Sequence, residues 1–480
     1  MKSKIIKYTV VLSMIISFSS CKKSFLEIDP KGKLIAKNIN DYDLMFNNTA
    51  QVTLNPDLDA QVLMGDEVTS IDPYFSGGAL REMRLFRWDD VIYQPSEDAV
   101  EMSALMKVLY TYNKIATEVP NAIGGTDAQK AKLKADALLN RAWIYFYLSN
   151  YYGKPYSGSA ATDLCYPIIT NSDVTETSFQ RATVQQVYDF MVTDLQTAIS
   201  ILPINPVDRT RGSRAAAEAL LGKIYVFMGK YTEGLKQFNN ALNDLPTNIK
   251  VGLYDYNVTM TNNGPWGYSS VTSPLTYVVG APLSPDYEEN LLARQFSNGY
   301  SFLSSFALLT PQAASLYTSS DQRLKFFTPK PFGGANFPAP GVLRRNGPIT
   351  VPCGVVLPEL YLLRAECKAR TNDIDGAKTD LETLRKNRMP AADATVNITD
   401  QTAMIKFIMQ ERTREFALQG YRWFDMRRLS VDPLFSGTTY IHTYTNSTGL
   451  NTTFTLKPER FVLRFPDKVM LANPGMANNP

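Results

Sequence analysis

The residues with the greatest potential for chemistry lie in one segment, 410–428, which reads QERTREFALQGYRWFDMRR. It holds five arginines and three carboxylates within nineteen residues, which suits either an acid–base site or a set of buried ion pairs. An acid–base site needs a carboxyl group whose pKa is shifted by burial away from compensating charge. Glu411 and Glu415 lie four residues apart on a predicted helix, and every acid has an arginine nearby that keeps it ionised. We therefore predict that this segment stabilises the fold.

The second half of the segment indicates how it is positioned. Gly420 is expected to end or bend the helix, which makes Tyr421, Trp423 and Phe424 available for burial beside it. Arg422 and Asp425 are expected to pair with each other or with free backbone groups. The acidic and basic side chains would then pair within and between helices.

The sequence patterns of common enzyme classes are missing. His442 is the only histidine, so histidine-dependent nucleophilic catalysis would rest on it alone, and zinc sites with paired histidines are excluded. It stands among polar residues and is predicted to be exposed on a surface loop. The glycine patterns GxSxG, GxxxxGKS/T and GxGxxG do not occur. We therefore predict a protein that is not an enzyme.

Two acidic patterns leave alternatives open. The pairs Asp66-Glu67 and Asp89-Asp90 could serve a carboxylate-pair glycoside hydrolase, although nothing in their spacing favours this over solvated or capping roles. Residues 371–382 partly match a calcium-binding EF-hand loop, but Thr371 stands at the first ligand position. We favour a polar turn between two helices there, and predict no metal or other cofactor.

The N-terminus has the pattern of a lipoprotein signal. Three lysines precede an apolar run at 8–18, and two serines then lead directly to Cys21. The run is too short to span a bilayer but suits a secretory signal. We predict that 1–20 is a signal peptide and that Cys21 is lipidated and anchors the chain in a membrane.

The charge balance and the cysteine content argue against a nucleic-acid-binding protein, a disulfide-rich protein and a zinc protein. Without the three leader lysines the chain carries 46 basic and 46 acidic residues, which argues against a nucleic-acid partner. Cys165, Cys353 and Cys367 form neither a disulfide framework nor a zinc pattern. Cys367 is predicted to be a small buried hydrophobe, whereas a single bridge between Cys165 and Cys353 stays open.

The elements that must position these residues are mostly helices. Residues 129–152 and 183–201 carry helical apolar stripes, and Thr183 is the predicted N-cap of the second. From Ala215, small and large residues recur at the positions of a tetratricopeptide repeat, and a weaker copy spans 359–385. The matching residues of the first copy are Leu221, Gly222, Tyr225, Gly234, Phe238, Ala241 and Pro246.

This pattern predicts a single, mostly α domain at 21–480, with a tetratricopeptide-like scaffold and long irregular loops. Helical repeats are expected at about 40–250 and 358–430. Residues 251–357 are rich in Gly, Pro, Ser, Asn and aromatics, and only about 301–317 looks helical. Further loop regions are expected at 66–95 and 431–480. Because long insertions in compact domains are usually functional, we expect the ligand site on the loops.

The order of several motifs resembles that of the RagB/SusD family of Bacteroidetes outer-membrane lipoproteins. Gln419 stands where the family usually has Glu, and Phe465-Pro466 replaces its Pro-Ile-Pro. The matching motifs are CKKSFLEIDPKG at 21–32, NRAWIYFYL at 140–148, YGKPY at 152–156, LYLLRAE at 360–366, the segment 410–428, and Asn-Pro at 473–474 and 479–480.

The resemblance implies a nutrient-capture protein that is not an enzyme. Members of the family sit on the cell surface, bind glycans or sometimes peptides, and act as a lid on a TonB-dependent, SusC-like transporter. Two other functions stay open: a tetratricopeptide scaffold that binds a protein or peptide, and a carboxylate-pair glycoside hydrolase.

Aromatic residues in the loops are the predicted ligand site. Apolar faces of sugar rings stack on aromatic side chains, while hydroxyl groups need planar polar partners. Glycines and a proline beside Trp266 are expected to leave the rings projecting. The alternative is that these rings pack the loops onto the repeats. The first predicted cluster is Tyr254, Tyr256, Asn263, Trp266 and Tyr268; the second is Tyr74, Phe75 and Trp88.

Overall fold

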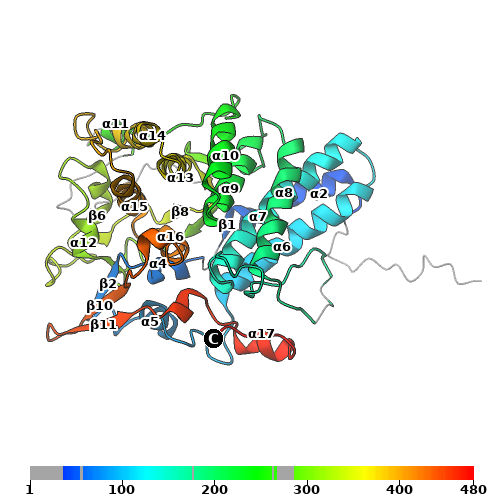
Figure 1. The fold of residues 1–480 in the computed structure, drawn as a ribbon. Coiled ribbons are helices and arrows are strands. Elements are labelled where there is room, and N and C mark those ends of the chain that lie inside the picture. Colours follow the sequence, from blue (N-terminus) through cyan, green and yellow to red (C-terminus); the bar gives the residue numbers. More distant parts are fainter. Residues whose placement is uncertain (1–35, 55–57, 174, 176–177, 262–263, 267–285) are drawn as a thin grey trace, which may run out of the picture.

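The computed structural model describes residues 36–54, 58–173, 175, 178–261, 264–266 and 286–480. The predicted signal peptide and Cys21 lie outside these residues, as do Asn263 and Tyr268. The fold is mostly α, as predicted: most of the long helices lie in the upper and right-hand parts of Figure 1, and a group of short strands lies at the lower left. Among the described residues, no helix combines the length and the apolar character that crossing a bilayer requires.

Five helices in sequence form the first part of the scaffold, each packed against the next. The two stripes predicted at 129–152 and 183–201 are both confirmed as helices. The hydroxyl of Thr183 accepts a hydrogen bond from the Gln186 amide, so the predicted N-cap is confirmed as well. The helices are α6 (Val100–Glu118), α7 (Asp127–Tyr152), α8 (Val184–Ile201), α9 (Arg214–Phe227) and α10 (Tyr231–Asn243).

The two predicted repeats form helical hairpins that stack on each other. The first is α9 with α10, and the second is α13 (Leu357–Arg370) with α14 (Ile374–Lys386); α10 packs against α13. Small residues bring the helices close: a Cβ added at Gly222 would lie 2.7 Å from the Phe238 ring. One added at Gly234 would lie 3.2 Å from the sulfur of the buried Cys367.

The segment that partly matched a calcium loop is the turn between α13 and α14. Asn372 has a left-handed backbone, with φ of 65°. The Asp373 carboxylate caps α14 by accepting a hydrogen bond from the Gly376 amide at 2.9 Å. This confirms the polar turn between two helices.

The 410–428 segment folds into two short helices joined at Gly420. Helix α15 (Gln401–Phe416) ends four residues before Gly420, which has a left-handed backbone with φ of 84° and is the N-cap of α16 (Tyr421–Leu429). Trp423 and Phe424 are buried, as predicted. Helix α16 packs against α4 (Ala60–Met64), which places the start of the 66–95 region next to the 410–428 segment.

Short strands tie the loop regions together. In the four-stranded sheet of order β11-β10-β2-β5, β10 runs parallel to β2 and antiparallel to β11. Smaller sheets join β1-β4-β8, β3-β9 and β6-β7. The strands are β1 (Thr53–Leu54), β2 (Val68–Ile71), β3 (Asn290–Leu292), β4 (Gln295–Ser297), β5 (Leu308–Leu309), β6 (Phe327–Thr328), β7 (Arg344–Arg345), β8 (Thr350–Pro352), β9 (Val355–Val356), β10 (Ile441–Thr445) and β11 (Asn451–Thr455).

Three sequence-based assignments of the loops need correction. The helical stretch predicted near 301–317 contains only the single turn α12 (Pro311–Ala314) together with β5. The expected loop at 66–95 holds β2 and α5 (Leu80–Arg87), and the expected C-terminal loop holds the β10–β11 hairpin and α17 (Asp467–Ala472). Strands of two to five residues are too short for their periodicity to be read. The remaining short helices are α2 (Ile39–Met45), α3 (Thr49–Val52), α11 (Tyr256–Thr259), η2 (Val119–Asn121), η3 (Gln322–Phe326), η4 (Pro433–Phe435) and η5 (Pro458–Phe461).

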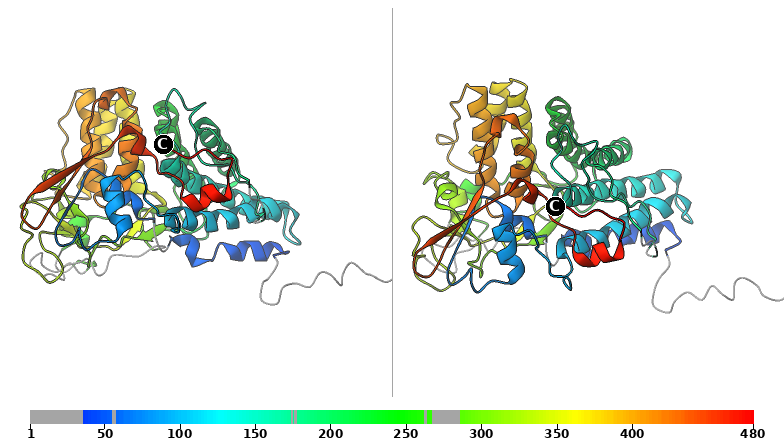
Figure 2. Two further views of the ribbon diagram at one scale, coloured as in Figure 1. Left: turned by 90° about the horizontal axis from the view of Figure 1, so that it is seen from below. Right: turned by 60° about the horizontal axis from the view of Figure 1, so that its bottom comes forward.

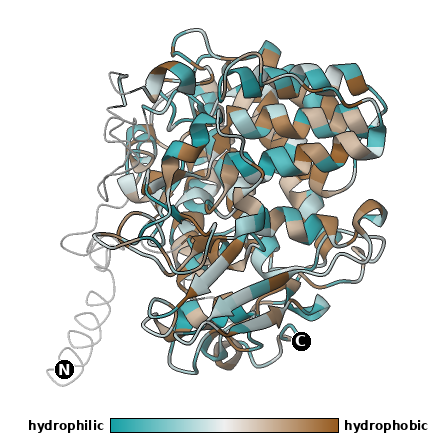
Figure 3. Ribbon diagram, turned by 90° about the vertical axis from the view of Figure 1, so that its left-hand side faces the viewer, coloured by the Kyte–Doolittle hydropathy of each residue, from teal (hydrophilic) through white to brown (hydrophobic). Residues whose placement is uncertain are grey.

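The hairpin of β10 and β11 reaches out on the side of the molecule away from α6 and α8 (Figure 2). Along the scaffold helices, hydrophilic and hydrophobic residues alternate, as expected for helices that bury one face (Figure 3). The main hydrophobic core extends from the helices into the loop regions, where it includes Phe75, Phe296 and Tyr440.

The burial of His442 contradicts the prediction from the sequence, and the structure decides the open question of two cysteines. His442 was predicted to be exposed, but it is fully buried on β10, with its ring stacked 3.8 Å from Trp88 and 4.5 Å from Phe86 between centroids. That prediction was wrong because pairing with β2 turns this position inward. Burial lowers the pKa of His442. Cys165 and Cys353 are buried free thiols, so the bridge left open is not formed.

Candidate functional site

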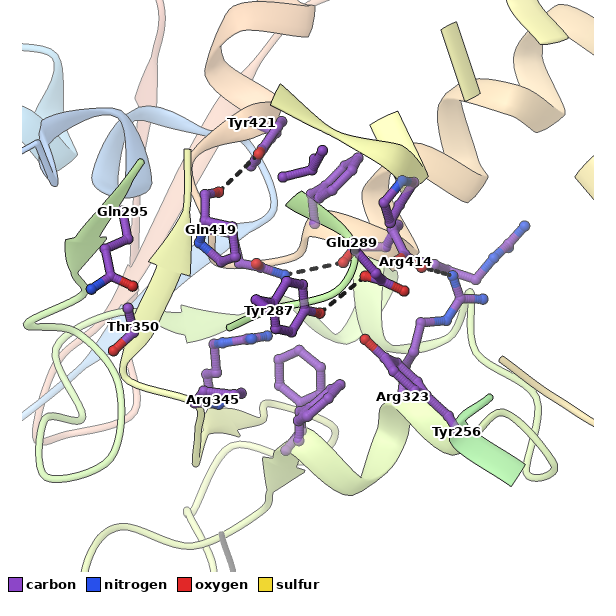
Figure 4. A pocket seen from close by; sticks show the side chains of 18 of the residues that line it. Tyr256, Tyr287, Glu289, Gln295, Arg323, Arg345, Thr350, Arg414, Gln419 and Tyr421 are labelled. Carbon is purple, nitrogen blue, oxygen red and sulfur yellow. Dashed lines mark hydrogen bonds and ion pairs between the residues drawn. The ribbon is translucent and has the colours of Figure 1, made fainter. Parts of the chain in front are cut away.

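A cavity of about 60 Å³ lies where the loop insertion meets α15 and α16. Two members of the first predicted cluster, Tyr256 and Trp266, line it together with residues of the 410–428 segment. Figure 4 shows the cavity from close by. Aromatic and planar polar side chains share its lining. Its lining includes Tyr256, Trp266, Tyr287, Glu289, Gln295, Arg323, Phe326, Phe327, Arg345, Thr350, Arg414, Glu415, Gln419 and Tyr421.

The aromatic wall is built from the insertion. Asp255 caps the short helix α11 through the Asn257 amide, which fixes Tyr256 at its start. The Trp266 ring packs against Tyr254 and Tyr256, with centroid distances of 5.0 and 5.2 Å. Only 3% of Trp266 is exposed, so its ring does not project as the sequence suggested. The chain folds back there through a hydrogen bond from the Trp266 amide to the Thr259 carbonyl.

The floor of the cavity is a buried ion network. Arg388, which is fully buried, donates to Glu289 at 2.8 Å and to Glu415 at 2.8 Å, and also to the Tyr254 carbonyl. Arg323 donates to Glu415 and to Glu411 at 2.8 and 2.7 Å. The network thus joins the insertion to α15.

Arginines keep the acids of α15 ionised despite their burial. Desolvation opposes the charge of Glu415, yet Arg388 and Arg323 hold its pKa below the usual value. The pKa of Glu411 is likewise held low, by Arg323, Arg414 and Arg385, against the effect of burial. The predicted role of the 410–428 acids in the fold agrees with these contacts.

The partners of Arg422 and Asp425 differ from the expected ones. Arg422 binds Asp66 through two hydrogen bonds of 2.6 and 2.9 Å, which links α16 to the early loop region. Asp425 instead pairs with Arg412 and Arg428. Sequence reasoning missed the first pair because its members lie 356 residues apart.

The second predicted aromatic cluster lies away from this cavity, beside the four-stranded sheet. Phe75 is buried against Phe86 and Tyr444. Trp88 is 5% exposed and donates from Nε1 to the Met64 carbonyl. Tyr74 is half-buried and meets Phe337 edge to face. The structure therefore does not bring the two predicted clusters together, and the ligand role of both stays a prediction.

A larger cleft of about 960 Å³ runs beside β10. Its lining is mostly threonine, asparagine and proline from five separate parts of the chain, so no local pattern in the sequence marks it. Tyr74 packs on a small apolar cluster that includes Ile71 and Val342, which also line the cleft. The polar residues that line the cleft include Thr69, Thr310, Gln312, Thr439, Thr443, Asn446 and Asn451.

The acidic pairs weighed for hydrolysis have unlike surroundings. Asp66 accepts a hydrogen bond from Arg422, and the charge of this arginine outweighs the effect of burial and lowers the pKa of Asp66. Glu67 is 3% exposed, and burial together with the nearby Asp66 charge raises its pKa to about 8. Asp89 pairs with Arg87 at the surface, and Asp90 is exposed.

The fold and the cavity define a class of protein: a tetratricopeptide-like helical scaffold whose loop insertion forms a pocket against the last repeat helices. Two family models match the chain. One, described as starch-binding and associating with the outer membrane, matches 102–226, and the other, described as the SusD family, matches 357–480. The chain belongs to the SusD family, as its motifs indicated.

Solved structures share this fold across nearly the whole chain. A protein of Bacteroides vulgatus has a TM-score of 0.69 at 19% identity, covering 93% of this chain and 99% of its own. A carbohydrate-binding SusD-like protein of the same species has 0.63 at 16%, covering 92% and 97%. A laminarin-binding SusD-like protein has 0.61 at 16%, covering 92% and 99%. The curated proteins yielded no match.

Proposed function

We propose that the protein captures oligosaccharides at the cell surface and delivers them to a SusC-like, TonB-dependent transporter. It would be held in the outer membrane by a lipid on Cys21, and it would bind its ligand without cleaving it. The observation that carries the proposal is the convergence of aromatic rings and planar polar groups on one cavity. Membership of the SusD family supports the same function.

The cavity offers both kinds of contact that a sugar needs. The Trp266 ring supplies apolar surface to the lining. Tyr256 and Tyr287 add two further rings, and Gln419 and Thr350 supply polar groups (Figure 4). Its volume accommodates a substituent or a few waters, because a water needs at least about 10–15 Å³. We infer that a sugar ring rests at the mouth and that one of its substituents enters. Few contacts imply modest affinity.

Calorimetry against a panel of oligosaccharides tests the proposal. Trp266→Ala should weaken binding about tenfold, which corresponds to about 1.4 kcal/mol. Because Trp266 is also packed, thermal unfolding must be measured alongside, and Gln419→Ala provides a second, half-buried change at the same cavity. Tyr110→Ala on α6 is the matched control, since Tyr110 is 40% exposed and does not line the cavity. Unchanged affinity in both folded cavity variants would move the site elsewhere.

The partner and the anchor are tested separately. A pull-down from membranes should recover a large β-barrel transporter, and Cys21→Ser should release the protein from the membrane fraction. Recovery of a soluble protein through the repeats would favour a peptide-binding scaffold instead. Release of reducing sugar from the polysaccharides of the same panel would favour hydrolysis.

A further inference from the structure

Arg345 lines the cavity but takes no part in the ion network beneath it. Its side chain is 4% exposed, and among the described residues no carboxylate lies within ion-pair distance of its guanidinium group. Nη1 makes one long contact, 3.4 Å, with the Ala417 carbonyl, and Nε has no hydrogen-bond partner in the part of the chain that the structure describes. A buried guanidinium normally has an acid beside it, so this arrangement calls for an explanation.

The surrounding charges leave one positive charge in excess. Five arginines and four carboxylates make up the buried group around the cavity, and every other arginine in it contacts at least one acid. The group consists of Arg323, Arg345, Arg385, Arg388 and Arg414 with Glu289, Asp321, Glu411 and Glu415. The unpaired charge is therefore at the cavity wall, where a ligand can reach it.

The local structure holds Arg345 in this position. It lies on β7, paired with Phe327 of β6, and its guanidinium group is within 5.3 Å of the Phe326 ring centre and 5.8 Å of the Phe327 ring centre. The neighbouring Arg344 points to the other face of the strand and donates to the Lys330 carbonyl and to Asn346. In Figure 4 the guanidinium group of Arg345 lies close beneath Tyr287, on the cavity side.

We propose that the cavity receives a carboxylate of the ligand through Arg345, so that the captured glycan contains uronic acid. This inference rests on the proposed function and names its substrate class. Guanidinium and carboxylate groups match in shape and form two parallel hydrogen bonds, which are stronger in a buried site than in water. A cavity of about 60 Å³ suits a carboxylate, and in a uronic acid this group is attached directly to the ring. The ring then stays at the aromatic mouth.

The ion network keeps its own acids away from Arg345. Glu289 and Glu415 also line the cavity, but both are bound to Arg388, and Glu415 to Arg323 as well. A carboxylate entering the cavity therefore meets a free cation beside already neutralised acids. Burial without an acidic partner lowers the pKa of Arg345 to about 10, which still leaves the group protonated at neutral pH.

The test compares uronic-acid oligosaccharides from pectin, alginate and glucuronan with their methyl esters, by calorimetry on the full chain. At least one acidic oligosaccharide should bind at least tenfold tighter than its ester. Arg345→Met should remove this preference, and Arg345→Lys should keep part of it, because lysine retains the charge but not the two-pronged geometry. Arg87→Gln, which removes a half-exposed arginine on α5, should leave it unchanged.

Thermal unfolding separates binding from a structural role. Because Arg345 has no acidic partner, Arg345→Met should unfold at the same temperature as the wild type or at a higher one. A strongly lowered midpoint would assign Arg345 to the fold and overturn the inference. Equal affinity for acid and ester would also overturn it while leaving glycan capture intact. Binding of no glycan at all, or binding only of peptides with a free C-terminal carboxylate, would overturn the proposed function itself.

Discussion

The helical repeats and the loop insertion are held in place by different forces. In the repeats, helices approach closely because small residues face large ones, as Gly222 faces Phe238. The insertion is fixed to α15 largely by buried charges, in which Arg388 joins Glu289 to Glu415. Small and large residues recur with the helical period in the repeats, whereas the ion pairs that fix the insertion join residues far apart in the chain, such as Glu289 with Arg388 and Arg323 with Glu415. The binding cavity lies on the side held by charge.

The largest effect is expected from removing Arg388. Arg388→Ala leaves Glu289 and Glu415 buried with less compensating charge, and it also removes the hydrogen bond to the Tyr254 carbonyl. We expect a loss of about 3–5 kcal/mol in the free energy of unfolding, measured by denaturant titration.

Arg87→Ala is the matched control for that experiment. Arg87 pairs with Asp89, but their side chains are 31% and 33% exposed, so the expected loss is only about 0–1 kcal/mol. If the two variants lost the same stability, the insertion would not depend on buried charge, and the contrast with the repeats would fail.

A second experiment concerns a buried acid that has no arginine of its own. Both carboxyl oxygens of Glu67 lack a hydrogen-bond partner among the described residues, and burial with the nearby Asp66 charge raises its pKa to about 8. Between pH 4.5 and 8 the folded state then keeps a proton that the unfolded state loses. Stability should therefore fall as pH rises through this window and level off above pH 8, by at most about 5 kcal/mol in total.

Glu67→Gln isolates this group from the others. The variant should be least different from the wild type near pH 5 and clearly more stable at pH 8, because the amide cannot ionise. Burial lowers the pKa of His442, so this residue makes the free energy of unfolding rise with pH below 6.5. It does so equally in both proteins. Parallel stability profiles for the two proteins from pH 5 to 8 would show that Glu67 is ionised in the folded state.

The contrast between local packing in the repeats and long-range contacts in the loop regions also explains how much of the fold could be predicted. Helices α7 and α8 and the repeat hairpins follow from local periodicity and caps, and Gly420 indicates the break between α15 and α16, although Leu418 in the same turn also has a left-handed backbone, with φ of 57°. The β10–β11 hairpin is local but its strands are too short for their periodicity to be read, and its pairing with β2 could not be predicted because it joins segments more than 370 residues apart.

The candidate site was only partly predictable, for a related reason. The aromatic residues near Trp266 stand out in composition, and two of them do line the cavity. Arg345 and Arg388 carry no local signal, since an arginine looks alike in sequence whether or not an acid reaches it. Whether a ring projects or packs likewise depends on neighbours such as Tyr254, which the turn at Trp266 brings into contact.

The smallest loss of stability is expected in the repeats, where the packing of small residues against large ones sets the distance between helices. A methyl group at Gly222 would lie 2.7 Å from the Phe238 ring, so Gly222→Ala must push the two helices apart or shift the ring. We expect a loss of about 1–3 kcal/mol, measured by denaturant titration. Phe238→Leu makes room, so the double variant should lose less than the sum of the two single changes. Strict additivity would mean that the two residues do not share the contact, and the close approach of α9 and α10 would need another cause.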